Sequence, residues 1–410
     1  MFLYGARGKH RVMKMIGQVL ITLVAALWVS GAFAAEVSDT SAPAGQVITT
    51  PGAVETTEPP KAFTYQFDYK GDALAPVSGG RDKGLNYLGN FDVNSDFHLT
   101  AQTHAYFEFL FAQGPSLSNR VGDIQYSSNI EAPAGSRIYQ AYVEQSFAQD
   151  RIAILAGIQD LGSEFYQTDS SGLFLNSSFW VGPELSRSGV NGPSVYPYPG
   201  LAARIKVIPL ENWTVRAAVY EGDPQRRNFT PNQGTLGVSE ISHAHQFGGQ
   251  AGKIAVGAWQ YSQAFDDLSE TSPQGTPFQG KSRGAYFLFD QKLYSRVQGE
   301  KAGISYFLRT GIANGEVNAV DQSLETGLSS VGLFSSRIDD QVGLAVAIAR
   351  ASEYAIGART ETAIELTYRA QLKTWLSIQP DFQYIISPAG DPGSLTPNTF
   401  VAGARTELTL

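Results

Sequence analysis

Apolar side chains recur at every second position through residues 361–386, ETAIELTYRAQLKTWLSIQPDFQYII. The positions between them carry Glu361, Glu365, Arg369, Gln371, Gln379, Asp381 and Gln383. An alternation with a period of two is the signature of a β-strand that has one apolar and one polar face. This stretch therefore predicts two strands, 360–372 and 375–386, joined by a turn of about two residues.

The same alternation recurs from Phe63 to the C-terminus and predicts an all-β chain. Gly-, Pro-, Asn- and Ser-rich loops such as 170–200 and 266–280 separate the strands, so that short and long connections alternate. No uninterrupted apolar run of about 18 residues follows residue 34, which excludes a helical membrane span there. Besides the two strands above, we expect strands at 63–69, 104–112, 137–147, 151–158, 201–208, 212–220, 253–261, 284–293, 303–312, 342–350 and 399–410.

Strand length favours a membrane barrel over a soluble sandwich, because both architectures produce alternating strands. The predicted strands 360–372 and 375–386 have 11 or more residues. A tilted transmembrane strand needs about 9–11 residues, whereas strands of globular proteins have about 5–6. Tyr368, Trp375 and Tyr384 stand on or near the apolar set, where a barrel carries its interfacial aromatic girdles. We therefore expect a transmembrane antiparallel β-barrel.

In such a barrel the apolar faces meet lipid and the charged faces meet water in the lumen, while closure of the sheet satisfies the backbone. The 350 residues from 61 to 410 allow about 22 residues per strand for 16 strands. That division does not distinguish 14, 16 and 18 strands. Pro380 conflicts with the pattern because it removes a ladder hydrogen bond, and we expect a local bulge there.

The first 34 residues have the organisation of a signal peptide. An apolar core at 16–29 precedes Ala-Phe-Ala at 32–34, and basic residues lead it at Arg7, Lys9, Arg11 and Lys14. A membrane anchor is the alternative, but about 14 apolar residues are fewer than the roughly 20 that a spanning helix needs. Residues 35–60 are rich in Pro and Thr and lack aromatic residues, which predicts a flexible tail. Residues 61–410 then form the barrel domain.

Composition narrows the function further. Only 17% of the residues are charged, against about 25% in ordinary soluble proteins. Cysteine is absent, which excludes disulfides and cysteine-based metal sites. Removal of residues 1–34 takes away four basic and no acidic residues, leaving 26 Lys and Arg against 38 Asp and Glu, a balance of −12. Without a basic stripe, this chain is a poor candidate for binding nucleic acid.

Many segments resemble the carbohydrate-selective porins of the OprB type, in the order of that family and over roughly residues 61–410. They are VGDIQYSSNI (121–130), RIYQAYVEQSF (137–147), AGIQDLGSEF (156–165), GLFLNSSF (172–179), YPYPGLAARIKV (196–207), NWTVRAAVYEGDP (212–224), SYFLRTGIANG (305–315), SSRIDDQVGLAVA (335–347) and the 361–390 stretch. The chain departs from the family in ending at Leu410 rather than Phe. Trp180 directly follows the FLNSSF segment (174–179), at a position where the family usually has a small residue. We expect the larger side chain to make the adjoining loop more obstructive.

The resemblance implies a 16-stranded outer-membrane barrel of a Gram-negative bacterium, with long extracellular loops and short periplasmic turns. It implies passive diffusion of glucose and related small sugars, with no enzymatic activity, no cofactor and no metal. Neutral sugars, outer-membrane lipid and the outer-membrane assembly machinery would be its partners, and a homotrimer is possible.

A sugar pore needs aromatic faces for C–H patches and charged groups that exchange hydrogen bonds with hydroxyls, each binding weakly enough to release the sugar. The polar faces of the strands supply such groups, and we expect the 160–200 loop to fold inward and narrow the channel. The pore-lining candidates are Tyr142, Glu144, Asp160, Glu164, Trp180, Arg204, Arg216, Arg309, Glu365, Arg369, Asp381, Arg405 and Glu407. For each charge alone, solvation of the wall is the simpler interpretation, and an extracellular lid is the alternative for the loop.

Three other functions stay open at this point. A general or weakly cation-preferring porin on the same barrel would fit the negative balance. A barrel enzyme would need a Ser/His or Asp/His pair near a rim, and only His98 and His104 lie close to an early strand. A secreted carbohydrate-binding sandwich would have shorter strands. Two weak metal signals, His243 with His245 and Asp339 with Asp340, lie in stretches that we interpret as a loop and a solvated turn.

Overall fold

The computed structural model describes residues 63–227, 233–271, 275–295, 301–355, 359–390 and 396–410. The predicted signal peptide, 1–34, and the predicted tail, 35–60, lie outside the described residues. No helix in the described ranges is long and apolar enough to cross a membrane.

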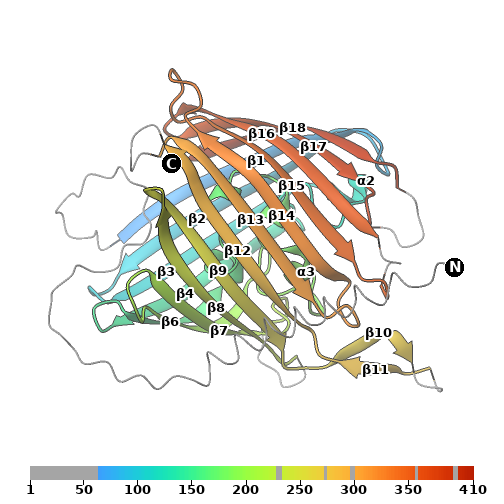
Figure 1. Cartoon of the computed structure of the whole chain (residues 1–410), viewed down its shortest axis with the longest axis horizontal. Coiled ribbons are helices and arrows are strands. Elements are labelled where there is room, and N and C mark those ends of the chain that lie inside the picture. The colour runs from blue at the N-terminus through green and yellow to red at the C-terminus, as the bar shows by residue number, and fades with distance from the viewer. Residues whose placement is uncertain (1–62, 228–232, 272–274, 296–300, 356–358, 391–395) are drawn as a thin grey trace.

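Within the part of the chain that is described, sixteen antiparallel strands close into one barrel, in which β1 pairs with both β2 and β18 (Figure 1). This confirms the predicted sixteen-stranded fold. The barrel strands are β1 (Phe63–Ser78), β2 (Asn86–His98), β3 (Thr103–Gln113), β4 (Gly135–Phe147), β5 (Ile152–Gln159), β6 (Gly200–Val207), β7 (Trp213–Glu221), β8 (Thr235–Phe247), β9 (Gln250–Tyr261), β12 (Arg283–Ser295), β13 (Gly303–Ala313), β14 (Val320–Val331), β15 (Gln341–Ala351), β16 (Thr360–Lys373), β17 (Leu376–Ile386) and β18 (Thr399–Thr409).

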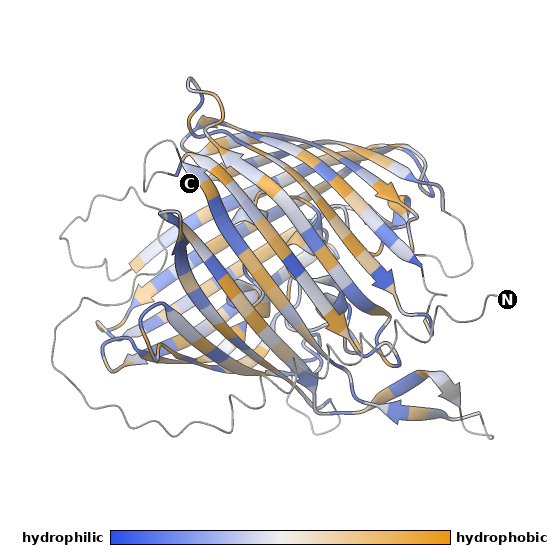
Figure 2. Ribbon diagram, viewed as in Figure 1, coloured by the Kyte–Doolittle hydropathy of each residue, from blue (hydrophilic) through white to orange (hydrophobic). Residues whose placement is uncertain are grey.

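The two faces of most barrel strands have opposite chemistry, which Figure 2 shows as alternating hydrophobic and hydrophilic bands along the strands. On β16 and β17, Leu366 and Phe382 are 49% and 43% exposed, whereas Glu365 and Asp381 have no exposed surface. A soluble protein distributes its side chains the other way round. The outer surface therefore suits hydrocarbon, and the polar groups are gathered inside the barrel.

Three barrel strands, β2, β8 and β14, were not predicted from the sequence. Their outward positions include small or polar residues, for example Ser239 and His243 on β8 and Thr326 on β14, so the contrast between alternate positions is weak. His243 and His245 were wrongly interpreted as loop residues. Both lie on β8, where the His243 ring stacks on Trp213 with their centroids 4.5 Å apart. These outward positions tolerate polar residues because the ladder, which is independent of side-chain type, holds the strand in register.

The bulge expected at Pro380 is wrong. Pro380 lies opposite Ala404 in a continuous register with β18. On its other side the ladder with β16 passes from the pair Thr367–Asp381 to Ala370–Ile378 without a shift, and the irregularity lies further on, at Gln371. In an antiparallel pair the hydrogen bonds alternate along the ladder, so the strand can leave out the bonds next to the proline and keep its alignment.

Asp340 was wrongly interpreted as part of a solvated turn. Its side chain is buried, and its two carboxylate oxygens accept hydrogen bonds from Arg337 Nε and Nη2 at 2.8 and 2.9 Å. Both residues lie in the connection from β14 to β15, residues 332–340, three positions apart. A bidentate pair of this kind occupies the carboxylate that a cation would need.

Short and long connections lie at opposite ends of the barrel. Turns such as 248–249 and 374–375 close the short-turn end, where β1 begins and β18 ends. The long-loop end carries the β10–β11 hairpin (Phe265–Thr271 and Pro277–Gly280), which projects from the barrel in Figure 1. Short helices lie in two of the long connections: α2 (Ser118–Val121) in one, and η1 (Leu161–Ser163), η2 (Asp169–Ser171), η3 (Ser177–Phe179) and α3 (Pro183–Ser186) in the other.

Candidate functional site

The connection from β5 to β6, residues 160–199, is here called the inner loop, because it folds into the barrel as we expected for this segment. Phe174 and Phe179 are buried against Phe307 of β13, with centroid separations of 5.7 and 5.9 Å. The facing strand β15 makes room with small residues: a Cβ on Gly343 would lie 2.6 Å from Phe174 Cζ. Apolar burial of this kind is the main force that holds such a loop against a wall.

Buried carboxylates of the wall bind the backbone of the loops. Glu365 of β16 accepts hydrogen bonds from the N–H groups of Leu175 at 2.6 Å and Asn176 at 2.9 Å. Glu361 does the same for Ile124 at 2.9 Å and Gln125 at 3.0 Å in the connection from β3 to β4. Backbone N–H groups away from water must find acceptors, and carboxylates are strong ones. These two side chains therefore hold the loops inside the barrel.

Arg309 of β13 holds the inner loop from another side. It has no exposed surface, and it donates hydrogen bonds to the carbonyl oxygens of Phe179 and Trp180 and to Ser171 Oγ, the last two at 2.6 and 3.1 Å. Its guanidinium also lies 4.8 Å from the centroid of the Tyr166 ring. Five fixed donors and a flat cation suit this combination of carbonyl and ring contacts.

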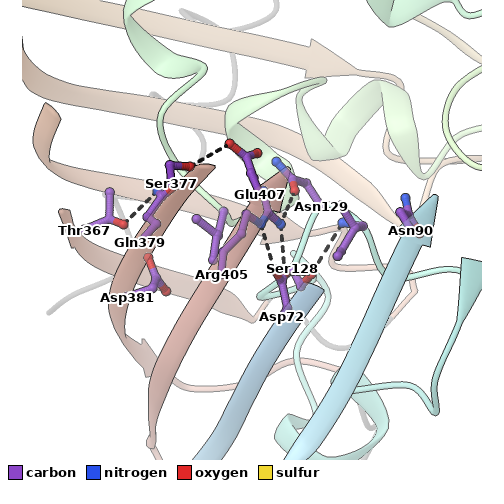
Figure 3. A network of polar contacts seen from close by, with 12 residues as sticks. Asp72, Asn90, Ser128, Asn129, Thr367, Ser377, Gln379, Asp381, Arg405 and Glu407 are labelled. Carbon is purple, nitrogen blue, oxygen red and sulfur yellow. Dashed lines mark hydrogen bonds and ion pairs between the residues drawn. The ribbon is translucent and has the colours of Figure 1, made fainter. Parts of the chain in front are cut away.

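The strands that close the barrel carry a polar network, shown in Figure 3. Arg405 of β18 binds both carboxylate oxygens of Asp72 on β1, at 2.7 and 2.8 Å, and donates to Asn129 Oδ1 at 2.7 Å. Nearby, Arg369 and Glu407 form an ion pair of 2.7 Å. Asp381 is buried and accepts a hydrogen bond from Gln383 at 2.9 Å. The network joins the first and last strands of the barrel to the loop between β3 and β4.

A second group of charges, here called the charged cluster, spans β4, β6, β7, β8 and the inner loop; its members are Glu144, Glu164, Arg204, Arg216 and Glu240. Arg204 pairs with both Glu144 and Glu164. Arg216 lies 3.4 Å from Glu164 and 3.7 Å from Glu240. Glu164 and Arg216 keep about a fifth of their side-chain surface exposed, so the cluster meets water in the lumen, and its three carboxylates are paired with two arginines.

Trp180 is the most exposed aromatic side chain of the inner loop at 38%, although its carbonyl oxygen is bound by Arg309. Its indole nitrogen lies close to Gly162, where any Cβ would collide with it. The adjacent Asp160 is buried and caps η1 through a hydrogen bond from the N–H of Gly162 at 2.7 Å. Burial raises the pKa of Asp160 to about 7, although hydrogen bonds from Tyr139 and Gly162 oppose the shift.

The thirteen candidates from the sequence thus fall into distinct surroundings. Tyr142, Glu144, Glu164, Arg204 and Arg216 lie together on one side of the lumen, with Trp180 on the loop. Arg309 and Glu365 are buried beneath the inner loop, Asp160 within it, and Asp381, Arg405, Arg369 and Glu407 belong to the network of β16–β18. Sequence reasoning missed Asp72, Glu240, Glu361, and the role of Asp290 as a loop ligand. Alternation could have identified Glu361 and Asp290, which lie on predicted strands, but not Glu240, because the alternation of β8 is weak.

A closed sixteen-stranded barrel with an apolar outer face, charges inside and a loop folded into the lumen defines a porin of the outer membrane. The family model described as "Carbohydrate-selective porin, OprB family" matches residues 82–410, and the chain belongs to this family. It is therefore a carbohydrate-selective channel rather than an enzyme.

Individual relatives agree with this assignment. The chain is similar to Porin B of Pseudomonas aeruginosa, with 23% identity over 84% of this chain and 87% of that protein. Among solved structures it resembles the high-pH structure of Pseudomonas putida OprB, with a TM-score of 0.76, 20% identity, and coverage of 85% and 94% of the two chains. It also resembles in-vitro folded OmpT of Vibrio cholerae in its trimer form, with a TM-score of 0.52, 12% identity, and coverage of 85% and 99%.

Proposed function

We propose that this porin passes glucose and related small neutral sugars by passive diffusion, along a path bounded by the inner loop on one side and by strands β1–β8 on the other. The observation that carries the proposal is that charged side chains on the two sides of the lumen differ in their exposure to water. Beneath the loop, Arg309 and Glu365 are fully buried, whereas Glu164 and Arg216 of the charged cluster remain in contact with water.

The chemistry of this path suits a sugar. Trp180 offers an exposed ring face for the C–H groups of a pyranose. Glu164 and Arg216 offer acceptors and donors for neighbouring hydroxyls, and their opposite charges limit any strong preference for one kind of ion. Because these groups are already bound to one another, each sugar hydroxyl replaces an existing contact, and binding stays weak enough for release.

Single-channel conductance of the protein in a planar bilayer tests the proposal. Current through the open channel is measured in potassium chloride while D-glucose is added, with glycerol as a control that has hydroxyls but no ring. We expect the current to fall saturably with glucose but not with glycerol. Equal, non-saturating changes with both solutes would instead identify a general porin that prefers cations weakly, since the balance after residue 34 is −12.

The same proposal includes the surroundings of the barrel. The exposed apolar belt would contact outer-membrane lipid, the long loops would face the cell exterior, and the outer-membrane assembly machinery would insert the chain. A homotrimer is supported by the similarity to an OmpT structure that is described as a trimer. Mass measurement of the detergent-solubilised protein before and after heating would distinguish a trimer from a monomer.

A further inference from the structure

Four aromatic rings form a row along the lumen face of β2, β3 and β4, here called the aromatic row: His98, His104, Tyr142 and Tyr106. Successive ring centroids are 5.5, 6.2 and 5.3 Å apart, and the two tyrosine rings are inclined by only 28°. The row begins at the short-turn end, where His98 pairs with His104 across the turn, and continues toward the middle of the barrel.

These rings face the lumen, and each keeps part of its surface exposed. Phe107 follows Tyr106 on β3 and is 37% exposed on the outer face, and Val143 follows Tyr142 on β4 and is 47% exposed there. Because neighbouring residues of a strand point to opposite faces, Tyr106 and Tyr142 lie on the inner face. Neither tyrosine is buried in the lumen, unlike Tyr166 and Tyr220, which are covered completely around the inner loop.

Polar groups are fixed beside the rings. Tyr106 donates from its hydroxyl toward Asn94 Oδ1 at 3.2 Å and Glu108 Oε2 at 3.1 Å. Gln140 Nε2 donates to the same Glu108 oxygen at 2.9 Å. The hydrogen bonds that Glu108 accepts from the described residues thus end on Oε2, which leaves Oε1 free to accept from a solute. His104 Nε2 lies 2.8 Å from Asp96, at the other end of the row.

The row continues into the charged cluster. Glu144, which pairs with Arg204, lies two positions after Tyr142 on the same face of β4. Because β4 runs toward the short-turn end, Glu144 lies nearer that end than Tyr142, level with His104, and a solute at the cluster therefore lies beside the row.

We propose that the aromatic row is a second sugar subsite, in which a pyranose ring stacks on Tyr106 or Tyr142 while its hydroxyls bond to Glu108 and Asn94. The inference rests on the proposed function and adds a binding position to it. A ring face beside fixed hydrogen-bond acceptors suits a cyclic sugar, which has apolar C–H patches between its hydroxyls. An acyclic polyol of the same size has no rigid apolar face and gains little from the rings.

The test compares ring removal with ring retention in the full-length protein. Glucose block is titrated in planar bilayers for the wild type, Tyr142→Ala, Tyr142→Leu, Tyr106→Ala and the ring-retaining Tyr142→Phe. We expect ring removal to raise the half-saturating glucose concentration by about three- to tenfold. Tyr142→Phe should stay within about twofold of the wild type, because it keeps the face on which the sugar stacks. Sorbitol serves as the acyclic control solute.

Tyr306→Ala is the matched control variant, because it removes a tyrosine from the outer face of β13, where Tyr306 contacts Thr326. The potassium chloride conductance of each variant shows that its channel is assembled, and Tyr142→Leu keeps the apolar bulk if the alanine variant does not assemble. Unchanged glucose block in the ring-removal variants would overturn the subsite and leave the proposed function standing. Variants that change ion preference but not glucose block would also overturn it. Absence of saturable block in the wild type would overturn both proposals.

Discussion

The two sides of the lumen carry the same kinds of residue and use them differently. On the side of β12–β17, Arg309 and Glu365 are fully buried and bind the backbone of the inner loop. On the side of β4–β8, Arg216 pairs with Glu164 of the inner loop and with Glu240, and both Arg216 and Glu164 stay partly exposed. The comparison teaches that a lumen charge has a structural role where a loop covers it and can meet a solute where no loop does.

The largest effect is expected from Arg309→Ala, which removes a side chain from the covered side of the lumen, the side of β12–β17. The change removes three hydrogen bonds: the carbonyl oxygen of Trp180 loses its Arg309 donor, and that of Phe179 keeps only the hydrogen bond from Ser171 Oγ. We expect a loss of about 3 kcal/mol or more in the docking of the inner loop. Single-channel conductance should rise and glucose block should weaken.

Arg350→Ala is the control for this prediction. Arg350 lies on the outer face of β15, where it pairs with Asp321 at 2.8 Å and keeps about a third of its side chain exposed. Loss of an exposed pair costs only about 0–1 kcal/mol, so conductance should be unchanged. Equal effects of the two arginine changes would contradict the division of the lumen into a covered and an open side.

Gly343→Leu tests the same docking through packing rather than through hydrogen bonds. A side chain at this position enters the space of the Phe174 ring, and overpacking of this kind costs about 1–3 kcal/mol. We expect a higher conductance and a lower thermal unfolding midpoint. Gly237→Ala on β8 is the control, because a Cβ there has no neighbour closer than Gln260 O at 3.8 Å. A Gly343→Leu channel with wild-type conductance would show that the loop does not depend on this contact.

Asp160, a buried residue of the inner loop, makes the stability of the folded protein depend on pH. Its pKa is raised by burial to about 7, above the usual value of about 3.9, so the folded state binds its proton more tightly than the unfolded chain does. Stability is therefore highest below pH 4 for this group and declines as the pH rises through 7, by on the order of a few kcal/mol.

Asp160→Asn tests the predicted decline of stability with rising pH. The amide can still accept a hydrogen bond from the N–H of Gly162 but carries no charge at any pH. Thermal unfolding midpoints at pH 5 and pH 9 should differ less in this variant than in the wild type, and the variant should be the more stable of the two at pH 9. A midpoint that falls more steeply with pH in the variant would rule out Asp160 as the source.

The fold could be predicted from the sequence to a greater extent than the site could. Lipid imposes apolar residues on one face of each strand, and Leu366 and Phe382 obey that rule clearly enough to define β16 and β17. The strand β8 was not predicted because the polar residues His243 and Ser239 interrupt the apolar pattern of its outer face. For the site, Glu365 and Glu144 have the same alternating surroundings. Their difference comes from a loop residue 190 positions away from Glu365, Leu175, whose contact no local pattern records.

The smallest effect is expected on the open side, from Arg216→Gln. Arg216 is partly exposed and its ion pairs are 3.4 and 3.7 Å long, so the free energy of unfolding should change by no more than about 0.5 kcal/mol. The lumen loses one positive charge beside Glu164 and Glu240, and cation preference should therefore increase. The zero-current potential across a potassium chloride gradient measures this preference, with Arg350→Gln on the outer face as the matched control. An Arg216→Gln channel with unchanged preference but lower stability would place Arg216 among the structural charges and remove it from the open side.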